Sequence, residues 1–323
     1  MTRQAPGKSH RDGLTLVQMM DMFPTDEAAT EWFESVIWPN GRHCPKCGSL
    51  NTRKASHKKM PYWCTDCRSY FSVRTGTAMQ ASKVPLRKWA IAIYLVITSL
   101  KSVPSMKLQR DIGVSQPTAW FMLHRIREAW ACDADNEPFD GPVEIDETYM
   151  GGKRRNKSNA ERNDLDGRGA ADMTAVVGAK CRASGRVEAR VVVQRTDKAT
   201  LQGFVDEVTE PDTVVYTDDA RAYQGIPNPH ETVKHSVSEY VNGMAHTNGI
   251  ESFWSMLKRA HKGTFHKLSP KHLQRYVSEF EGRHNHRHSD TIDQMRDTVA
   301  RLVDRNLLLR DLIACNGLSN AGR

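Results

Sequence analysis

Four of the seven cysteines stand in two pairs with the spacing of a metal site. Two residues separate Cys44 from Cys47 and Cys64 from Cys67, and sixteen residues lie between the pairs. A C-x2-C turn places two thiolates on one zinc ion, so two such turns supply the four ligands of a tetrahedral site. Four protein ligands leave no open position for water, and we therefore expect a structural zinc ribbon. A redox C-x-x-C pair is the alternative, which the doubled motif disfavours.

Three acidic residues lie where a hard cation is commonly bound. Asp146 falls in the alternating segment Val143–Tyr149, which predicts a strand, and Asp218 directly follows a second, short apolar strand. Glu251 lies on an amphipathic helix predicted over His246–Arg259. Adjacent central strands would bring the two aspartates together, and carboxylate oxygens are the ligands that Mg²⁺ prefers. Each acid alone is more often a turn, cap or surface residue, so the prediction depends on all three.

A helical block precedes these strands. The periodicity predicts one helix over Leu86–Leu100, a short second helix that begins at Pro104 and ends at Gly113, and a third helix capped by Ser115. A short helix, a glycine turn and a longer helix form a helix-turn-helix pattern. Its second helix would present base-contacting residues at its N-terminal end and phosphate contacts further along, respectively Gln116, Thr118 and Ala119, and His124, Arg125 and Arg127. An ordinary helical hairpin is the alternative.

The second half of the chain reads as an α/β domain. Strand patterns cover Met173–Lys180 and Val187–Gln194 after a polar loop (residues 153–172), and a helix is predicted over Lys198–Val208. Hairpin strands followed by a helix and a further strand predict a mixed sheet. Helices are also expected over Ser269–Arg287 and Arg296–Leu309, followed by a mobile tail.

The basic charge is confined to one end of the chain. The formal net charge is +8. Residues 1–134 hold 19 Lys and Arg against 10 Asp and Glu, whereas residues 135–323 hold 27 against 28. An excess restricted to the N-terminal part indicates a module that docks on an anion, and nucleic acid is the commonest large anion. The longest apolar run, Trp89–Leu100, is too short and too interrupted for a membrane span, and no signal peptide is expected.

The acidic motifs resemble those of a known group of enzymes. Asp146 in VEIDETYMGGK, Asp218 in VVYTDDARAY and Glu251 in HTNGIESFWSMLKR are similar to the three acids of bacterial insertion-sequence transposases with a ribonuclease-H-like core. The order of ribbon, helix-turn-helix and acidic core resembles the insertion-sequence family numbered fifteen ninety-five. The resemblance covers roughly residues 20–290.

The resemblance implies roles for particular residues. In that family the three acids bind two divalent ions, Mg²⁺ or Mn²⁺, and a Lys or Arg seven residues after the last acid contacts DNA. Lys258 matches that place, with Arg259 beside it, and Asn248 is a candidate substitute or partner for Glu251. A glycine often follows the second acid, where this chain has Asp219; Asp218 is preferred because it directly follows the strand.

The resemblance implies a DNA transposase that cleaves transposon ends and transfers the 3′-OH into target DNA. We expect double-stranded DNA as partner, a homodimer or larger synaptic assembly, and a cytoplasmic, nucleoid-associated bacterial location. A non-catalytic DNA-binding regulator and a structure-selective nuclease are the alternatives. The predicted divisions are an N-terminal arm and helix, the zinc ribbon, the helix-turn-helix region, the ribonuclease-H-like catalytic domain, and a C-terminal helix and tail (residues 1–40, 41–80, 84–134, 140–290 and 291–323).

Overall fold

The computed structural model describes residues 11–131, 137–151, 159, 173–193, 196–233 and 246–318. The chain divides into two compact units, each described here by itself. The first comprises Met1–Ala131 and His286–Cys315, and the second comprises Cys132–Asn285 and Asn316–Arg323. The predicted polar loop lies outside the described residues except for Asn159, and the predicted tail lies outside them only from residue 319 on.

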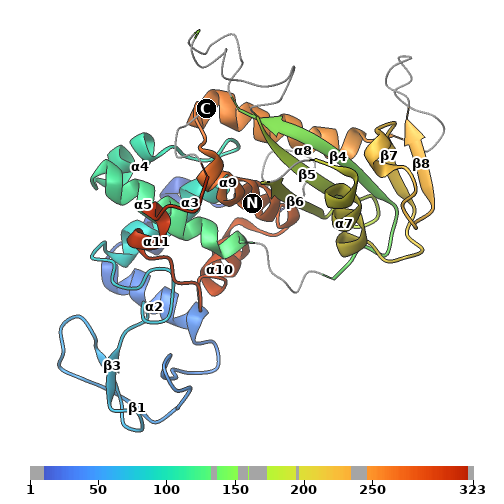
Figure 1. Ribbon diagram of the computed structural model, residues 1–323. Helices are drawn as coiled ribbons and strands as arrows, with labels where there is room; N and C mark the ends of the chain where they lie inside the picture. Colours follow the sequence, from blue (N-terminus) through green and yellow to red (C-terminus); the bar gives the residue numbers. More distant parts are fainter. Residues whose placement is uncertain are drawn as a thin grey trace. The chain divides into compact units, whose positions relative to one another are not determined.

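The first unit joins a small sheet to a group of helices (Figure 1). Its sheet has three short antiparallel strands, β1 (Thr52–Lys54), β2 (Tyr62–Cys64) and β3 (Ser69–Phe71). Its helices are α1 (Leu16–Met22), α2 (Asp26–Ile37), α3 (Leu86–Thr98), α4 (Ser105–Ile112), α5 (Gln116–Arg127), α10 (Thr291–Ala300) and α11 (Leu309–Ile313).

The α4–α5 pair forms as the residue pattern predicts. Gly113 ends α4 in the left-handed region, with φ of 61°, a conformation that glycine adopts without strain. Ser115 then caps α5 by accepting a hydrogen bond from the backbone N–H of Thr118. Two helices joined by a tight glycine turn are thus present.

The C-terminal helix differs from its prediction. It was expected over Arg296–Leu309, whereas α10 begins at Thr291 and ends at Ala300. Met295, Val299 and Leu302 are fully buried in the same core as the N-terminal helices. The last part of the chain is therefore integral to the first unit. Sequence periodicity cannot show this, because it does not specify the partner of an apolar face.

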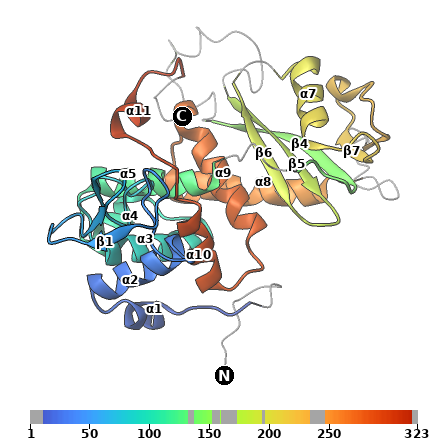
Figure 2. The same cartoon turned by 90° about the horizontal axis from the view of Figure 1, so that it is seen from below.

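The second unit is a mixed sheet with helices on both faces (Figure 2). Its strand order is β6-β5-β4-β7-β8, with antiparallel pairing from β6 to β4 and parallel pairing from β4 to β8. The strands are β4 (Val143–Met150), β5 (Thr174–Cys181), β6 (Val187–Val192), β7 (Val215–Asp218) and β8 (His230–Val233). The mixed α/β sheet expected from the strand patterns is confirmed.

The two faces of the sheet bury different residues. Helix α7 (Lys198–Val208) packs its apolar side chains against one face, which includes Val143 and Ile145. Helices α8 (Asn248–Ala260) and α9 (Leu273–Asn285) cover the other face. Because side chains alternate along a strand, the even-numbered residues of β4, Asp146 among them, point toward α8 and α9.

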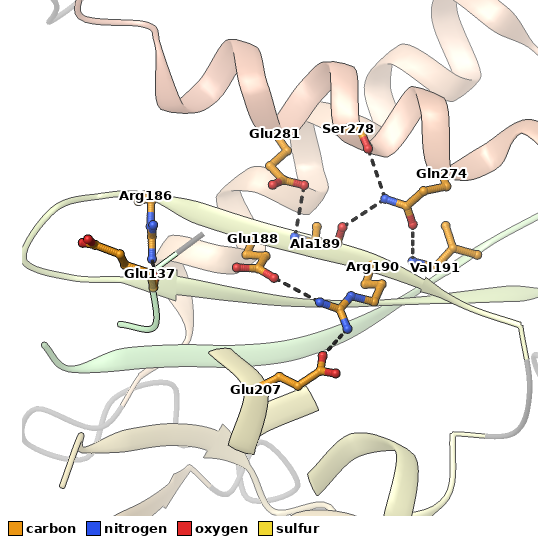
Figure 3. Close-up of polar contacts among 10 residues, drawn as sticks. All are labelled: Glu137, Arg186, Glu188, Ala189, Arg190, Val191, Glu207, Gln274, Ser278 and Glu281. Carbon is orange, nitrogen blue, oxygen red and sulfur yellow. Dashed lines mark hydrogen bonds and ion pairs between the residues drawn. The ribbon is translucent and has the colours of Figure 1, made fainter. Parts of the chain in front are cut away.

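Side chains of α9 pair the open edge of β6, as Figure 3 shows. Gln274 accepts from the backbone N–H of Val191 at 2.7 Å and donates to the carbonyl of Ala189 at 3.3 Å. Glu281 accepts from the N–H of Ala189 at 3.3 Å, and Asn285 pairs with both backbone groups of Val187 at 2.8 Å. An edge strand normally exposes these groups, so α9 takes the place of a neighbouring strand here.

Candidate active site and zinc ribbon

The four paired cysteines converge in the first unit. Their sulfur atoms all lie within 4.8 Å of one another, and the sulfurs of Cys44 and Cys67, and those of Cys47 and Cys64, are 3.6 Å apart. A tetrahedron of sulfurs with zinc bonds of about 2.3 Å has edges of about 3.8 Å, so the arrangement fits zinc. Hydrogen bonding from the Cys67 backbone lowers the pKa of the Cys64 thiol.

The second unit brings Asp146 and Asp218 onto neighbouring strands. The parallel register pairs Glu144 with Tyr216, and two residues further along each strand lie Asp146 and Asp218. Both aspartates are half-buried, whereas Asp219 is exposed. The strand position therefore favours Asp218 over Asp219 as the residue facing Asp146.

Glu251 approaches these aspartates from the first turn of α8. Burial, with smaller contributions from the negative charges of Asp218 and Glu251, raises the pKa of Asp146 to about 6. The Glu251 side chain is exposed, and its Oε1 accepts a hydrogen bond from Thr247 at 3.0 Å. Asp218 and Glu251 are thus both close enough to Asp146 to repel its carboxylate, and a cation is the natural counter-charge for such a group.

Glu147 is a fourth acid in this neighbourhood, which sequence reasoning did not single out. Burial raises its pKa to about 7, and the charges of Asp218 and Asp146 act in the same direction. The buried Tyr223 lies beside it. Its position next to Asp146 in the chain is the only sequence signal, because strand alternation alone would send it away from the acids.

Asp146, Glu147 and Glu251 line a cleft of about 470 Å³, and Asp218 is not among its lining residues. Glu251 and Lys258 face it from the same side of α8, seven residues apart, together with neighbouring cationic residues. The lining consists of Asp146, Glu147, Glu251, Trp254, Ser255, Lys258, Arg259 and Lys262. Carboxylates at one part of the cleft and ammonium and guanidinium groups at another suit a cation and a phosphate bound side by side. Asn248 is exposed at the start of α8 and does not line this cleft.

A buried ion-pair network fixes the start of α8 against the sheet. Glu144, only 2% exposed, accepts from Arg182 Nε at 2.9 Å and from the backbone N–H of Ile250 at 3.0 Å. Arg182 also donates to the carbonyl of His246 at 2.5 Å, and its guanidinium lies 3.8 Å from the centre of the Tyr216 ring. Glu144, Tyr216 and Ile250 each stand one or two residues from one of the three acids. We call this set the Glu144–Arg182 network.

Two glycines permit α8 to approach the strands. A Cβ on Gly249 would lie 2.6 Å from the Glu144 carboxylate, and one on Gly178 would lie 2.6 Å from the Trp254 ring. Gly178 pairs with Asp146 across β4 and β5, so Trp254 packs directly beside the acid. These contacts set the height of Glu251 above Asp146. Sequence patterns missed the network and both glycines, since nothing local marks their partners.

The predicted DNA contacts on α5 fall into two groups. Gln116 and Thr118 are partly exposed at its N-terminal end. Arg125 and Arg127 are 6% and 1% exposed, and Ala119 and His124 are fully buried. Arg125 Nε donates to the carbonyl of Leu307, and its guanidinium stacks on Phe121. Both arginine side chains are thus buried, and this placement argues against the expectation that they contact phosphates.

Comparison with known proteins agrees with these features. The ISXO2-like transposase domain matches residues 138–285, and the transposase zinc-ribbon domain, which carries the same IS1595 designation, matches residues 24–70. A protein in transposable element ISH50 of Halobacterium salinarum is 31% identical over 276 residues, which cover 80% of this chain and 90% of that protein. The chain belongs to the IS1595 family of insertion-sequence transposases.

Two further proteins are similar over shorter or looser matches. A transposase-like protein of Haemophilus influenzae is 34% identical over 98 residues, covering 29% of this transposase and 78% of that protein. A chain of a simian T-cell lymphotropic virus intasome, in complex with a PP2A regulatory subunit, covers 52% of this transposase and 58% of that chain at 16% identity. Its TM-score of 0.26 is too low to support an argument about fold.

The family assignment gives the cysteine cluster its metal. A match to a transposase zinc ribbon and four sulfurs at tetrahedral spacing together identify a structural zinc site in this transposase.

Within the part of the chain that the structure describes, no helix combines the length and apolar character needed to cross a membrane.

Proposed function

We propose that the acidic cleft of the second unit cleaves DNA at the ends of an insertion sequence and joins the resulting 3′-OH to target DNA. The convergence of Asp146, Asp218 and Glu251 beside a row of basic residues is the observation that carries this proposal. The mixed sheet with helices on both faces supports a ribonuclease-H-like core for the cleft.

The donor set suits hard divalent cations. Carboxylate oxygens are the preferred ligands of Mg²⁺ and Mn²⁺, and the mutual repulsion of these acids is relieved by positive charge. Asp146, Asp218 and Glu251 would hold two ions. When bound, such a pair activates water or a hydroxyl for in-line attack and stabilises the leaving oxygen.

The residues of α8 would bind and orient the DNA strand. Lys258 and Arg259 line the same cleft as Glu251, and Lys262 follows one turn later. Their cationic groups would neutralise the phosphates that flank the scissile bond and hold them in line with the acids. Trp254 and Ser255 complete the wall beside them. Asn248, exposed at the helix start, would have at most a secondary role.

The first unit would dock on duplex DNA. The α4–α5 pair would act as a helix-turn-helix, with Gln116 and Thr118 at the end of α5 that would face the major groove. Joining two element ends requires two active sites, so we propose at least a homodimer. A DNA substrate also places the working enzyme in the bacterial cytoplasm, at the nucleoid.

The test is to incubate the purified transposase with the DNA that flanks its gene, in the presence of Mg²⁺ or Mn²⁺, and to map 3′ nicks on a gel. Asp146→Asn, Asp218→Asn and Glu251→Gln should abolish nicking and leave end binding intact. Asp219→Asn is the matched control, because Asp219 is the exposed neighbour of Asp218. Full nicking by Asp146→Asn would refute the site. Nicking without joining would favour a nuclease, and end binding without nicking would favour a regulator.

A further inference from the structure

The zinc ribbon has one face turned to its own core and one turned to solvent. Tyr62, Cys64 and Phe71 are buried, and Tyr62 and Phe71 pack against Trp38. The residues that alternate with them point the other way. The strand register places Arg53 opposite Trp63, and Trp63 opposite Tyr70, in one row across all three strands. We call Arg53, Trp63 and Tyr70 the ribbon row.

The ribbon row is aromatic and accessible. Tyr70 is 44% exposed, Arg53 is exposed and Trp63 is partly exposed. The Trp63 and Tyr70 rings are 4.6 Å apart between centroids, and the His57 ring lies 5.2 Å from that of Tyr70. Burying such rings is favourable, so leaving them at the surface of a small sheet requires a reason.

The surroundings of the row are strongly basic. Residues 41–74 contain eight Lys and Arg against the single acid Asp66. Asp66 is engaged locally, accepting hydrogen bonds from Ser49 and Asn51. Even after a zinc ion bound by four thiolates contributes a charge of −2, the segment keeps a net charge of +5. Six of the eight basic residues are exposed: Lys46, Arg53, Lys54, Lys58, Lys59 and Arg68.

Exposed aromatic rings on a sheet, surrounded by lysines and arginines, suit a ligand that carries both flat rings and phosphate groups. Unpaired bases offer a flat π-surface to such rings, and their phosphates are held by nearby lysines and arginines. A base within a duplex has both faces covered by its neighbours and cannot stack in this way. We propose that the ribbon row is a binding site for single-stranded DNA, in which unpaired bases stack on Trp63 and Tyr70.

This site is separate from the acidic cleft and does not depend on catalysis. It also gives a use to the basic excess of the N-terminal part, which Arg125 and Arg127 cannot supply from their buried positions. The competing explanation is that Trp63 and Tyr70 only stabilise the sheet, as cross-strand aromatic pairs commonly do. The two explanations differ in what ring substitutions do to binding.

The experiment measures the affinity of the zinc-loaded full-length chain for a fluorescent oligo-dT and for a duplex of equal length. Tyr70→Leu and Trp63→Leu should weaken oligo-dT binding roughly ten- to hundredfold each, while duplex affinity changes less than twofold. Tyr70→Phe keeps the ring and should bind as the parent does. Tyr149→Leu, at an exposed tyrosine of the second unit, is the control and should change neither affinity.

Two further measurements do not require the leucine variants to fold. Oligo-dT should quench the tryptophan fluorescence of the parent chain, and Trp63→Phe should remove most of the quenching while retaining zinc. The slope of the logarithm of oligo-dT affinity against the logarithm of salt concentration should become shallower by about 1.4 in the double variant Lys58→Gln with Lys59→Gln. Oligo-dT affinity within twofold of the parent in both leucine variants, or quenching that persists in Trp63→Phe, would overturn the proposal.

Discussion

The cysteines of the zinc ribbon and the acids of the cleft are brought together in different ways. Cys44 and Cys67 are 23 positions apart, and each belongs to a tight turn that already holds its partner thiol. Asp146 and Asp218 are 72 positions apart and depend on a parallel strand pair, while Glu251 arrives on a helix. Among the described residues, only the cysteines have all their ligand atoms within 4.8 Å of one another.

The difference lies in what sets the geometry. In the ribbon, the metal and two short turns define the site, and the surrounding sheet is small. In the cleft, the sheet and the Glu144–Arg182 network define the positions of the carboxylates. A bound cation would then draw these carboxylates together. We therefore expect the ribbon to unfold when a cysteine ligand and the zinc ion are lost. We expect the cleft to lose activity when the residues that support its carboxylates are changed.

The largest effect should come from breaking the ribbon. Cys64→Ser should lose zinc and unfold the region of β1–β3, since zinc binding supplies about 10–16 kcal/mol in isolated zinc-finger peptides. Zinc content by atomic absorption and protease sensitivity of the ribbon measure this. Cys315→Ser, at an exposed free cysteine outside the site, is the control. Full zinc content in Cys64→Ser would contradict the four-sulfur site.

The next effect concerns the support of the cleft. Gly249→Ala places a methyl group 2.6 Å from the Glu144 carboxylate and should displace the first turn of α8, costing about 1–3 kcal/mol. DNA nicking should fall at least tenfold, and hydrogen exchange should rise in the peptide that contains Ile250.

Matched variants separate this displacement from general destabilisation. Gly203→Ala, in α7 with open space around it, should leave nicking unchanged and add up to about 1 kcal/mol of stability. Glu144→Gln retains the acceptor for Ile250 but loses the charge pair with Arg182, and it should raise the Mg²⁺ concentration needed for half-maximal nicking. An unchanged Mg²⁺ midpoint together with unchanged exchange at Ile250 would show that the network does not position Glu251.

A smaller effect is expected in the pH dependence of stability. Asp146 has a raised pKa of about 6 when folded against 3.8, so the folded state binds more protons between these values. Glu147 adds to this up to about pH 7, and this contribution is separate from that of Glu281 in the same pH range. In Mg²⁺-free buffer, stability should therefore fall as the pH rises through this window.

Thermal unfolding by fluorescence, with and without millimolar Mg²⁺, measures the dependence. Added Mg²⁺ should raise the melting temperature at pH 7 to 8 and have little effect at pH 5, where Asp146 is protonated. Asp146→Asn should show a shallower pH dependence and a smaller response to Mg²⁺. Equal responses in the two proteins would mean that the cation acts elsewhere.

The smallest effect is expected from Glu281, a buried acid for which we propose no role in metal binding. Burial, with a smaller contribution from the charge of Glu188, raises the pKa of Glu281 to about 8. Glu281 should therefore contribute a loss of stability as the pH rises from about 5 to 8, and Glu281→Gln should remove that contribution. Its gain at pH 8 should be on the order of 1 kcal/mol with no response to Mg²⁺. Chemical denaturation at pH 5 and pH 8 measures this gain.

Glu207→Gln is the control for Glu281, since Glu207 is an exposed acid that pairs with Arg190. It should stay within about 0.5 kcal/mol of the parent at both pH values. A stability loss in Glu281→Gln at pH 8 would show that the α9–β6 contact requires the ionised carboxylate.

Much of the local structure could be predicted from the residue pattern. The α4–α5 pair follows from Gly113 and the Ser115 cap, and β4 from the alternation of Val143–Tyr149, because these signals depend on near neighbours. The bounds of α10 and the burial of Arg125 and Arg127 could not, since a basic helix face looks the same whether solvent or the C-terminal segment covers it. Asp146, Asp218 and Glu251 were predicted from their strand and helix positions together with the resemblance, whereas Glu147 and Glu144 were missed.

The sequence by itself determined the zinc ligands, because a C-x2-C turn is complete within four residues. It also determined the individual helices and strands around the acids and, through three motifs, the family. Only the tertiary structure decided that Glu144, Arg182 and Gly249 hold α8 over Asp146, and that Arg53, Trp63 and Tyr70 share one open face. The physical reason is that both arrangements depend on strand register and helix packing, which join residues that no short-range pattern connects.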